Sequence, residues 1–183
     1  ENTGLKRFAV CQHIDGSDWK AVKEERREII DFLIDYAMKN PEMEVVTEQL
    51  YDDGVYLLQR VAEHEPELAV EMEKLLARQG GCPAGDRIVN VDYRGNVHLC
   101  PYWQYRTIGN IREQKLSDIC FDEEDEILAM MKDKTQHLKG KCGRCMHKHL
   151  CRGCGARAEE MCGDLFGTDP ACYLTEEEVA AVR

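Results

Sequence analysis

The stretch Cys142-Gly-Arg-Cys145-Met-His-Lys-His-Leu-Cys151-Arg-Gly-Cys154 contains two Cys-x2-Cys pairs. A gap of two residues lets both thiolates of a pair reach the same metal centre, and Gly143 and Gly153 permit the turns that this wrapping needs. Three more cysteines complete the pattern on either side of the stretch: Cys82, Cys100 and Cys172. We therefore expect sulfur-held metal, rather than apolar packing alone, to organise this part of the chain.

The whole chain has 183 residues, ten cysteines and a formal net charge of −11. This length suits one ordinary domain or two small ones, and 43% hydrophobic with 32% charged residues is typical of a folded protein. The negative charge disfavours nucleic acid as a partner. No apolar run is long enough to span a membrane, and the absence of a signal-peptide pattern favours a cytoplasmic location.

Residues 1–81 alternate between strand and helix patterns. We expect strands over 8–14 and 44–47, and helices over 19–39, 55–62 and from Pro66 to Gly80, an order typical of an α/β layer with parallel strands. Such a layer would have open strand edges, and the chain begins at Glu1 without Met. We therefore expect a piece of a longer protein.

Residues 82–175 have a different sequence pattern, which predicts a small Cys-rich α+β domain. Strands over 88–93 and 97–100 flank a turn at 94–96, which predicts a β-hairpin. Short helices are expected over 116–119 and 126–131, whereas 138–173 shows little periodicity. Thr175 and Glu178 form a capping box that opens a terminal helix within 176–183.

Three kinds of cysteine site fit the spacing. A disulfide framework needs an oxidising compartment, which the absent signal pattern does not support. Structural zinc takes four ligands, and imidazoles are near in sequence: His137, His147 and His149. Two [4Fe–4S] clusters need up to eight thiolates, and seven cysteines are suitably spaced.

The remaining candidates have simpler interpretations. Cys11, Cys120 and Cys162 are expected to be buried structural thiols. His98 alternates with Leu99 along the hairpin and is expected to face solvent. Aromatic residues in 102–105 are expected to cover a cluster and exclude water, with stacking on a flat substrate as the alternative.

The order Cys-x12-Gly-x4-Cys, Cys-x2-Cys-x5-Cys-x2-Cys and a final Cys resembles the SPASM domain, the auxiliary-cluster domain of many radical S-adenosylmethionine (radical SAM) enzymes. Residues 109–113 (Gly-Asn-Ile-Arg-Glu) and 151–158 (Cys-Arg-Gly-Cys-Gly-Ala-Arg-Ala) carry the same resemblance. It implies that 1–81 is the C-terminal remnant of a radical SAM (β/α) barrel, that 82–175 is the SPASM domain and that 176–183 is a terminal helix.

The resemblance also implies a ligand set for two auxiliary [4Fe–4S] clusters. The outer cluster would be held by Cys142, Cys145, Cys151 and Cys172. The inner cluster would be held by Cys82, Cys100 and Cys154. The inner cluster's fourth ligand stays unknown, with Asp86 or a residue outside this chain as candidates. Cys11 and His13 would lie near the mouth of the barrel.

Residues 138–145 and 163–176 are similar to the tetrapyrrole-modifying branch of the SPASM group, as are 5–8 and 51–56. This implies an oxidoreductase or lyase that trims or decarboxylates side chains of a haem precursor. S-adenosylmethionine and a third [4Fe–4S] cluster would belong to the full-length parent, with a small redox protein as electron donor. The alternatives are a peptide or protein maturase, and a non-catalytic zinc or electron-carrier module.

The radical-generating motif Cys-x3-Cys-x2-Cys does not occur among these 183 residues. We therefore predict that this chain alone does not cleave S-adenosylmethionine.

Overall fold

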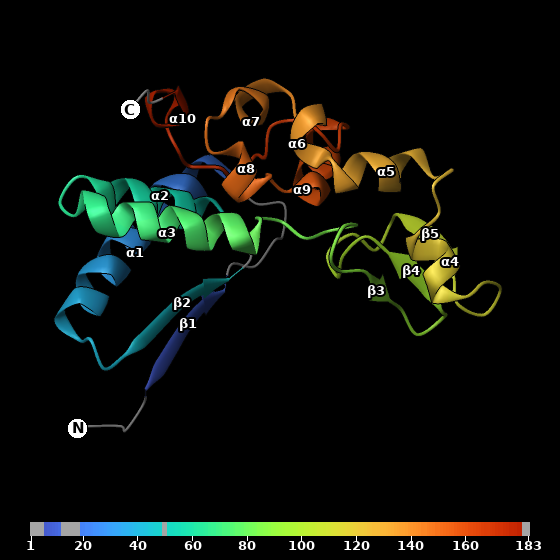
Figure 1. Ribbon diagram of the computed structural model, residues 1–183, viewed down its shortest axis with the longest axis horizontal. Helices are drawn as coiled ribbons and strands as arrows, with labels where there is room; N and C mark the ends of the chain where they lie inside the picture. The colour runs from blue at the N-terminus through green and yellow to red at the C-terminus, as the bar shows by residue number, and fades with distance from the viewer. Residues whose placement is uncertain (1–5, 12–18, 49–50, 181–183) are drawn as a thin grey trace.

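The computed structural model describes residues 6–11, 19–48 and 51–180, which form helices and two small sheets (Figure 1). The first sheet pairs β1 (Arg7–Cys11) in parallel with β2 (Glu44–Glu48), and α1 (Trp19–Lys39) connects the two strands. This confirms the predicted α/β order. The predicted extension of the first strand, over 12–14, lies outside the described residues. Two strands do not define a barrel, so the barrel stays a prediction from the resemblance.

A helix pair follows, formed by α2 (Asp52–Ala62) and α3 (Pro66–Gln79). The α2 helix begins before the predicted position because two carboxylates in its first turn favour a helix N-terminus. The α3 helix has the predicted bounds, with Pro66 in its first turn and Gly80 left-handed at its end (φ 66°).

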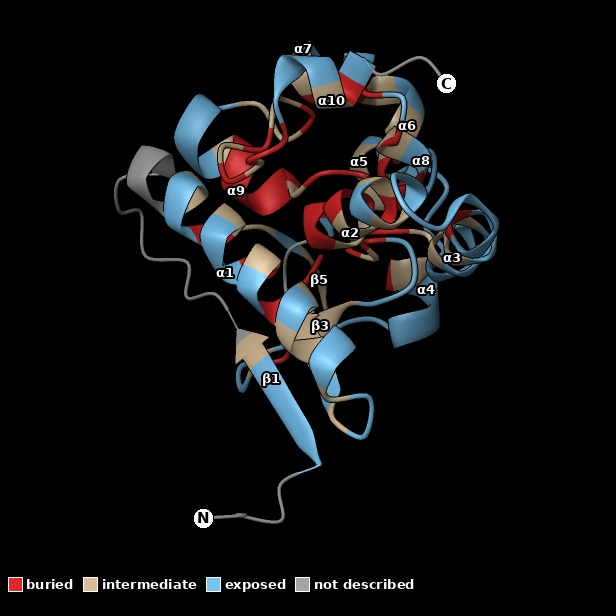
Figure 2. Ribbon diagram, turned by 90° about the vertical axis from the view of Figure 1, so that its left-hand side faces the viewer, coloured by how far each residue is buried: buried red, intermediate tan, exposed pale blue. Residues whose placement is uncertain are grey.

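The N-terminal helices share their apolar core with segments near the C-terminus. The buried members of this core are Ile30, Leu33, Val55, Tyr56, Leu58, Ala69, Cys145, Leu150, Tyr173, Leu174 and Val179. Figure 2 shows buried residues on α2 and on α9 (Gly155–Cys162), whereas β1 is largely exposed. The segments around the cysteines are therefore supported by the N-terminal helices.

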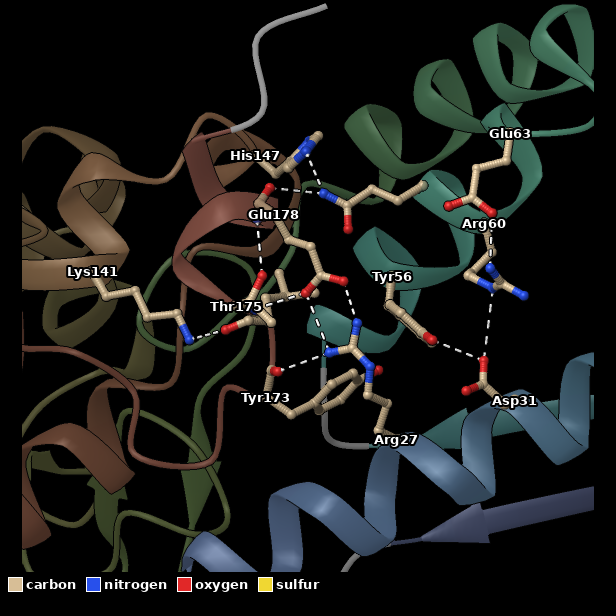
Figure 3. A network of polar contacts seen from close by, with 12 residues as sticks. Arg27, Asp31, Tyr56, Arg60, Glu63, Lys141, His147, Tyr173, Thr175 and Glu178 are labelled. Atoms are coloured by element: carbon tan, nitrogen blue, oxygen red, sulfur yellow. Dashed lines mark hydrogen bonds and ion pairs between the residues drawn. The ribbon is translucent and has the colours of Figure 1, made fainter.

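A polar network joins the same elements (Figure 3). Arg27 on α1 pairs with Glu178 on α10 (Glu176–Ala180) and donates to the Tyr173 carbonyl at 3.2 Å. Gln59 on α2 donates to the Glu178 carbonyl at 2.8 Å. The last helix is thus held by both α1 and α2.

The second sheet has three antiparallel strands in the order β3 (Asn90–Val91), β4 (Asn96–His98) and β5 (Thr107–Asn110). The predicted hairpin is present, and Asp92 Oδ1 accepts the backbone N–H of Asn96 at 2.8 Å across the turn. The third strand was not predicted, since its four residues are too few to show an alternating pattern.

His98 is buried, so the prediction that it faces solvent is wrong. It is only 2% exposed, and its Nδ1 lies 2.9 Å from the Arg106 carbonyl oxygen. The register between β4 and β5 shifts at Val97 and His98. This irregularity breaks the alternation of faces and buries both side chains.

Six short helices lie in the described segment between the second sheet and α10: α4 (Leu116–Cys120), α5 (Glu126–Lys132), α6 (Lys134–His137), α7 (Gly140–Arg144), α8 (Lys148–Cys151) and α9 (Gly155–Cys162). Helices of this length are not stable alone in water and depend on tertiary contacts. The predicted capping box at α10 is present, because Thr175 Oγ1 accepts the Glu178 N–H at 3.1 Å and Glu178 Oε2 accepts the Thr175 N–H at 2.7 Å. None of the helices in the described ranges is long and apolar enough to cross a membrane.

Candidate metal centre

The four cysteines predicted for the outer cluster line one small cavity: Cys142, Cys145, Cys151 and Cys172. They come from α7, its C-terminal cap, the end of α8 and the loop before α10. Apolar side chains form much of the remaining wall: Val55, Leu138, Leu174 and Val179. The fold therefore brings together thiols that are spread over the last part of the sequence.

Backbone amides face the sulfurs of this outer site. The Asp169 N–H donates to Cys142 Sγ at 3.3 Å. Burial raises the pKa of the Cys172 thiol to about 12, against the opposing effect of the Leu174 amide. Amides act in the same way on Cys145 and Cys151. A thiol that ionises this reluctantly becomes a thiolate when it binds a metal.

Charged side chains also reach the outer site. Lys141 donates from Nζ to the carbonyl of Cys172 at 3.3 Å and to that of Leu174, which ties α7 to the loop of the last ligand. Asp52 is buried at the same cavity. Burial, and then the nearby Asp169, raise the pKa of its carboxyl to about 7.

The three cysteines predicted for the inner cluster gather in a second place. Cys82 and Cys100 are each 8% exposed and belong to an apolar cluster with Trp103, against which Cys154 packs. Burial raises the pKa of Cys100 and Cys154, and the charge of Cys82 raises both further. Cys82 thus lies within electrostatic reach of both other thiols.

Cys82 is held against the outer site by its own backbone. Its N–H donates to the Cys151 carbonyl at 3.0 Å. Gly81 precedes it with φ 61°, and a Cβ at Gly81 would lie 2.7 Å from the Leu150 carbonyl oxygen and closer still to that of Cys151. Only glycine allows this approach of the two segments.

Asp86, the candidate for the fourth inner ligand, is paired instead with Arg152, whose Nη1 donates to Asp86 Oδ2 at 2.6 Å. Tyr51 is a neighbour that the sequence did not indicate. Burial raises the pKa of its phenol, and the charges of all three inner cysteines act in the same direction.

Asp169 connects the two sites. Its backbone N–H donates to Cys142 Sγ at 3.3 Å, and its carboxylate accepts the Cys154 N–H at 2.9 Å. Arg157 donates to the same carboxylate from Nε at 2.8 Å, which makes a buried ion pair. In the sequence Asp169 stands in a polar loop before a proline and looks like a surface residue.

The cysteines outside the motif differ from one another. Cys162 is exposed at the end of α9, so the prediction that it is buried is wrong. Cys162 is the last residue of α9, beside the left-handed Gly163, whose Cβ position has nothing within 4 Å. Cys120 is half-buried, and the side chains of Cys11 and His13 lie outside what the structure describes.

The imidazoles named as zinc ligands are used elsewhere. His137 packs on the Phe166 ring, His147 lies 3.1 Å from the Gln59 amide, and His149 Nδ1 lies 3.2 Å from the Met146 carbonyl oxygen. Within the described ranges, no three His, Cys, Asp or Glu side chains lie close enough to hold a single metal ion. All nine described cysteines are free thiols. The side chains that gather at the two predicted sites are therefore thiols that no disulfide joins.

The aromatic residues after Cys100 divide into two roles. Trp103 is fully buried, packs in the same apolar cluster as Cys82 and Cys100, and donates from Nε1 to Glu159 Oε2 at 2.6 Å. Tyr102 and Tyr105 are 52% and 58% exposed. They are accessible to a ligand at the surface.

Residues 82–146 match the SPASM family, described as an iron–sulfur cluster-binding domain. The chain is related to the radical SAM proteins that carry this domain, in their haem-biosynthesis branch. It is 35% identical to Fe-coproporphyrin III synthase of Methanosarcina barkeri, over 85% of this chain and 41% of that protein. It is 34% identical to pre-heme d1 synthase of Dinoroseobacter shibae, over 83% of this chain and 39% of that protein.

AdoMet-dependent heme synthase of Methanosarcina barkeri is 37% identical over 58% of this chain and 29% of its own length. The chain thus spans well under half the length of the curated relatives that it matches. No solved structure matches it.

Proposed function

We propose that this chain binds two auxiliary [4Fe–4S] clusters, the outer on Cys142, Cys145, Cys151 and Cys172 and the inner on Cys82, Cys100 and Cys154. The observation that carries the proposal is the single cavity lined by the four outer cysteines. Four cysteine thiolates are the usual ligand set of a [4Fe–4S] cluster, and the outer cysteines supply four.

A bound cluster supplies one-electron transfer, which protein side chains do not provide. The chain's own contribution is to hold and insulate the sulfurs. The Asp169 amide hydrogen-bonds to a thiolate, Trp103 excludes water from the inner site, and Lys141 fixes the loop of the last outer ligand. Hydrogen bonds and burial of this kind set a cluster's reduction potential.

The test is the iron and acid-labile sulfide content of the chain after purification without oxygen. We expect about eight of each per chain, and about four in either Cys82→Ala or Cys142→Ala. Cys162→Ala is the matched control, because that thiol is exposed and outside both sites. About four in the wild type, unchanged by Cys82→Ala, would contradict the inner site. Zinc without sulfide would contradict both.

We further propose that the full-length parent trims or decarboxylates side chains of a haem-precursor tetrapyrrole. The names of the relatives support this substrate class. Residues 1–81 would be the end of the radical SAM barrel. S-adenosylmethionine, a third [4Fe–4S] cluster and a small redox protein as electron donor belong to the same proposal, as does a cytoplasmic location, where free thiols persist.

Two measurements test this second step. Iron coproporphyrin III, added to the cluster-loaded chain, should alter the electron paramagnetic resonance signal of the inner cluster, and an unchanged signal would contradict a substrate position beside it. The chain with S-adenosylmethionine and a reductant should form no 5′-deoxyadenosine, since the radical-generating motif is not among its residues.

A further inference from the structure

Lys134 is a lysine almost completely removed from water. The residue is 1% exposed, and its Nζ donates a 2.8 Å hydrogen bond to the Gly153 carbonyl. In the described part of the chain, no carboxylate forms an ion pair with it. Burial of an ammonium group costs free energy unless an opposite charge compensates it. The compensating negative charge for Lys134 must therefore come from another group.

The hydrogen bond places Lys134 where the two cysteine sites meet. Gly153 stands between Cys151 of the outer site and Cys154 of the inner site. A Cβ at Gly153 would lie 3.3 Å from the Sγ of Cys142, so the residue that accepts from Lys134 also adjoins an outer sulfur.

The effect of the Lys134 charge on the cysteine pKa values agrees with a position beside both sites. Burial raises the pKa of Cys100 in the inner site and of Cys142 in the outer site, and the Lys134 charge opposes that rise at both thiols. One cation therefore acts on a ligand of each site.

The other cations near the two sites are not uncompensated buried charges that act on a ligand of each site. Arg157 is compensated by its ion pair with Asp169, and the buried Arg152 by its ion pair with Asp86. Lys141 and Lys148 line the outer cavity and donate to carbonyls of its loops. Among the residues that the structure describes, this leaves Lys134 as the buried cation whose charge both sites could balance.

We propose that the Lys134 ammonium is a shared counter-charge for the two clusters and holds the reduction potential of each above the value that it would otherwise have. The inference rests on the proposed binding of two clusters. A cluster with its thiolate ligands is anionic, and reduction adds one electron and one more negative charge. A cation between the clusters stabilises the reduced form of either.

The test compares four variants of the cluster-loaded chain by redox titration, monitored by electron paramagnetic resonance. Lys134→Met removes the charge and the hydrogen bond, Lys134→Gln keeps a donor, and Lys134→Arg keeps the charge. Lys132→Met is the matched control, because Lys132 is exposed and belongs to the adjacent helix.

In the Met and Gln variants of Lys134 we expect both clusters to become at least tenfold harder to reduce, which is a fall of about 59 mV for a one-electron couple. Lys134→Arg and Lys132→Met should stay near the wild type. Unchanged potentials in the loaded neutral variants would overturn the proposal. A shift at one cluster only, or an equal shift in Lys132→Met, would also overturn it.

Cluster loading is measured first, because it separates the two proposals. A wild-type chain without iron and sulfide would contradict the proposed function itself. If the neutral variants lose their clusters and Lys134→Arg keeps both, the charge is required and the inference stands. If Lys134→Arg loses them too, Lys134 acts through packing and the inference is wrong.

Discussion

Gly81, the residue before the first motif cysteine, combines a left-handed backbone conformation with a close contact. Its φ of 61° costs any other residue about 1–2 kcal/mol, and an added Cβ would also press on the Leu150 and Cys151 carbonyls. We predict that Gly81→Ala destabilises the chain by more than this strain and lowers its iron content, as measured by urea unfolding and iron analysis. Gly163→Ala is the control, since Gly163 has φ 70° and nothing within 4 Å of its Cβ position. Equal effects of the two variants would contradict the role of the contact.

Asp169 is the second residue on which both sites depend. Asp169→Asn would leave Arg157 buried without its counter-charge, which typically costs about 3–5 kcal/mol. The free energy of unfolding in urea measures this cost. The control is Glu176→Gln, which breaks the exposed pair with Arg144 and should cost less than about 1 kcal/mol. A similar cost in the two variants would show that the buried pair is not stabilising.

Individual residues differ in how far the sequence indicates their role. The grouping of the motif cysteines could be proposed from their spacing and a family resemblance. Lys134 and Asp169 could not be found in this way, because each stands in a polar stretch. Their burial comes from contacts with Gly153 and Cys154, which the spacing does not reveal.

At the scale of elements, α10 depends on the carboxylate of Glu178. Burial alone would raise its pKa, but hydrogen bonds from Arg27 and the Thr175 amide outweigh burial and lower it from 4.5. A carboxyl whose pKa is lower in the folded state stabilises that state above its ordinary pKa, and this stabilisation is lost as the pH falls through the lowered value.

We therefore predict that the stability difference between the wild type and Glu178→Gln shrinks as the pH falls below 4.5. Urea unfolding of both chains at a series of pH values from about 6 to about 3 measures this difference. A difference that is constant over the whole range would mean that the carboxylate charge is not what holds α10.

Elements with their own sequence signals were predictable, and those that depend on neighbours were not. The helix from Pro66 to Gly80 has an apolar face, a proline start and a glycine end, so its bounds follow from local chemistry. The β5 strand and the register shift at His98 of β4 both arise from the pairing between these two strands. The helices α6 to α9 have four to eight residues each, too few to show a clear helical period in the sequence.

At the scale of the whole molecule, the two parts of the chain differ in how they are stabilised. The α1 helix has 21 residues and a regular apolar face, whereas α6 and α8 have four residues each. Helices as short as these need external support, which bonds to a metal cluster can supply.

We predict that removal of the clusters by a chelator and an oxidant increases amide hydrogen exchange in residues 134–162 much more than in α1. Mass spectrometry of peptides from the two regions, before and after removal, measures the effect. Equal protection of residues 134–162 in both states would show that side-chain packing is enough to hold the short helices.

The last helix covers the outer sulfurs. Val179 is 2% exposed and, with Leu174, forms part of the wall beside the four thiols. Since α10 is only five residues long, a protease that trims the chain just after Leu174 would open that wall to dissolved air. Oxygen destroys exposed iron–sulfur clusters, so in air the trimmed protein should lose its visible cluster absorption faster than the intact protein. The lifetime of the outer cluster in air would then depend on one short helix at the end of the chain.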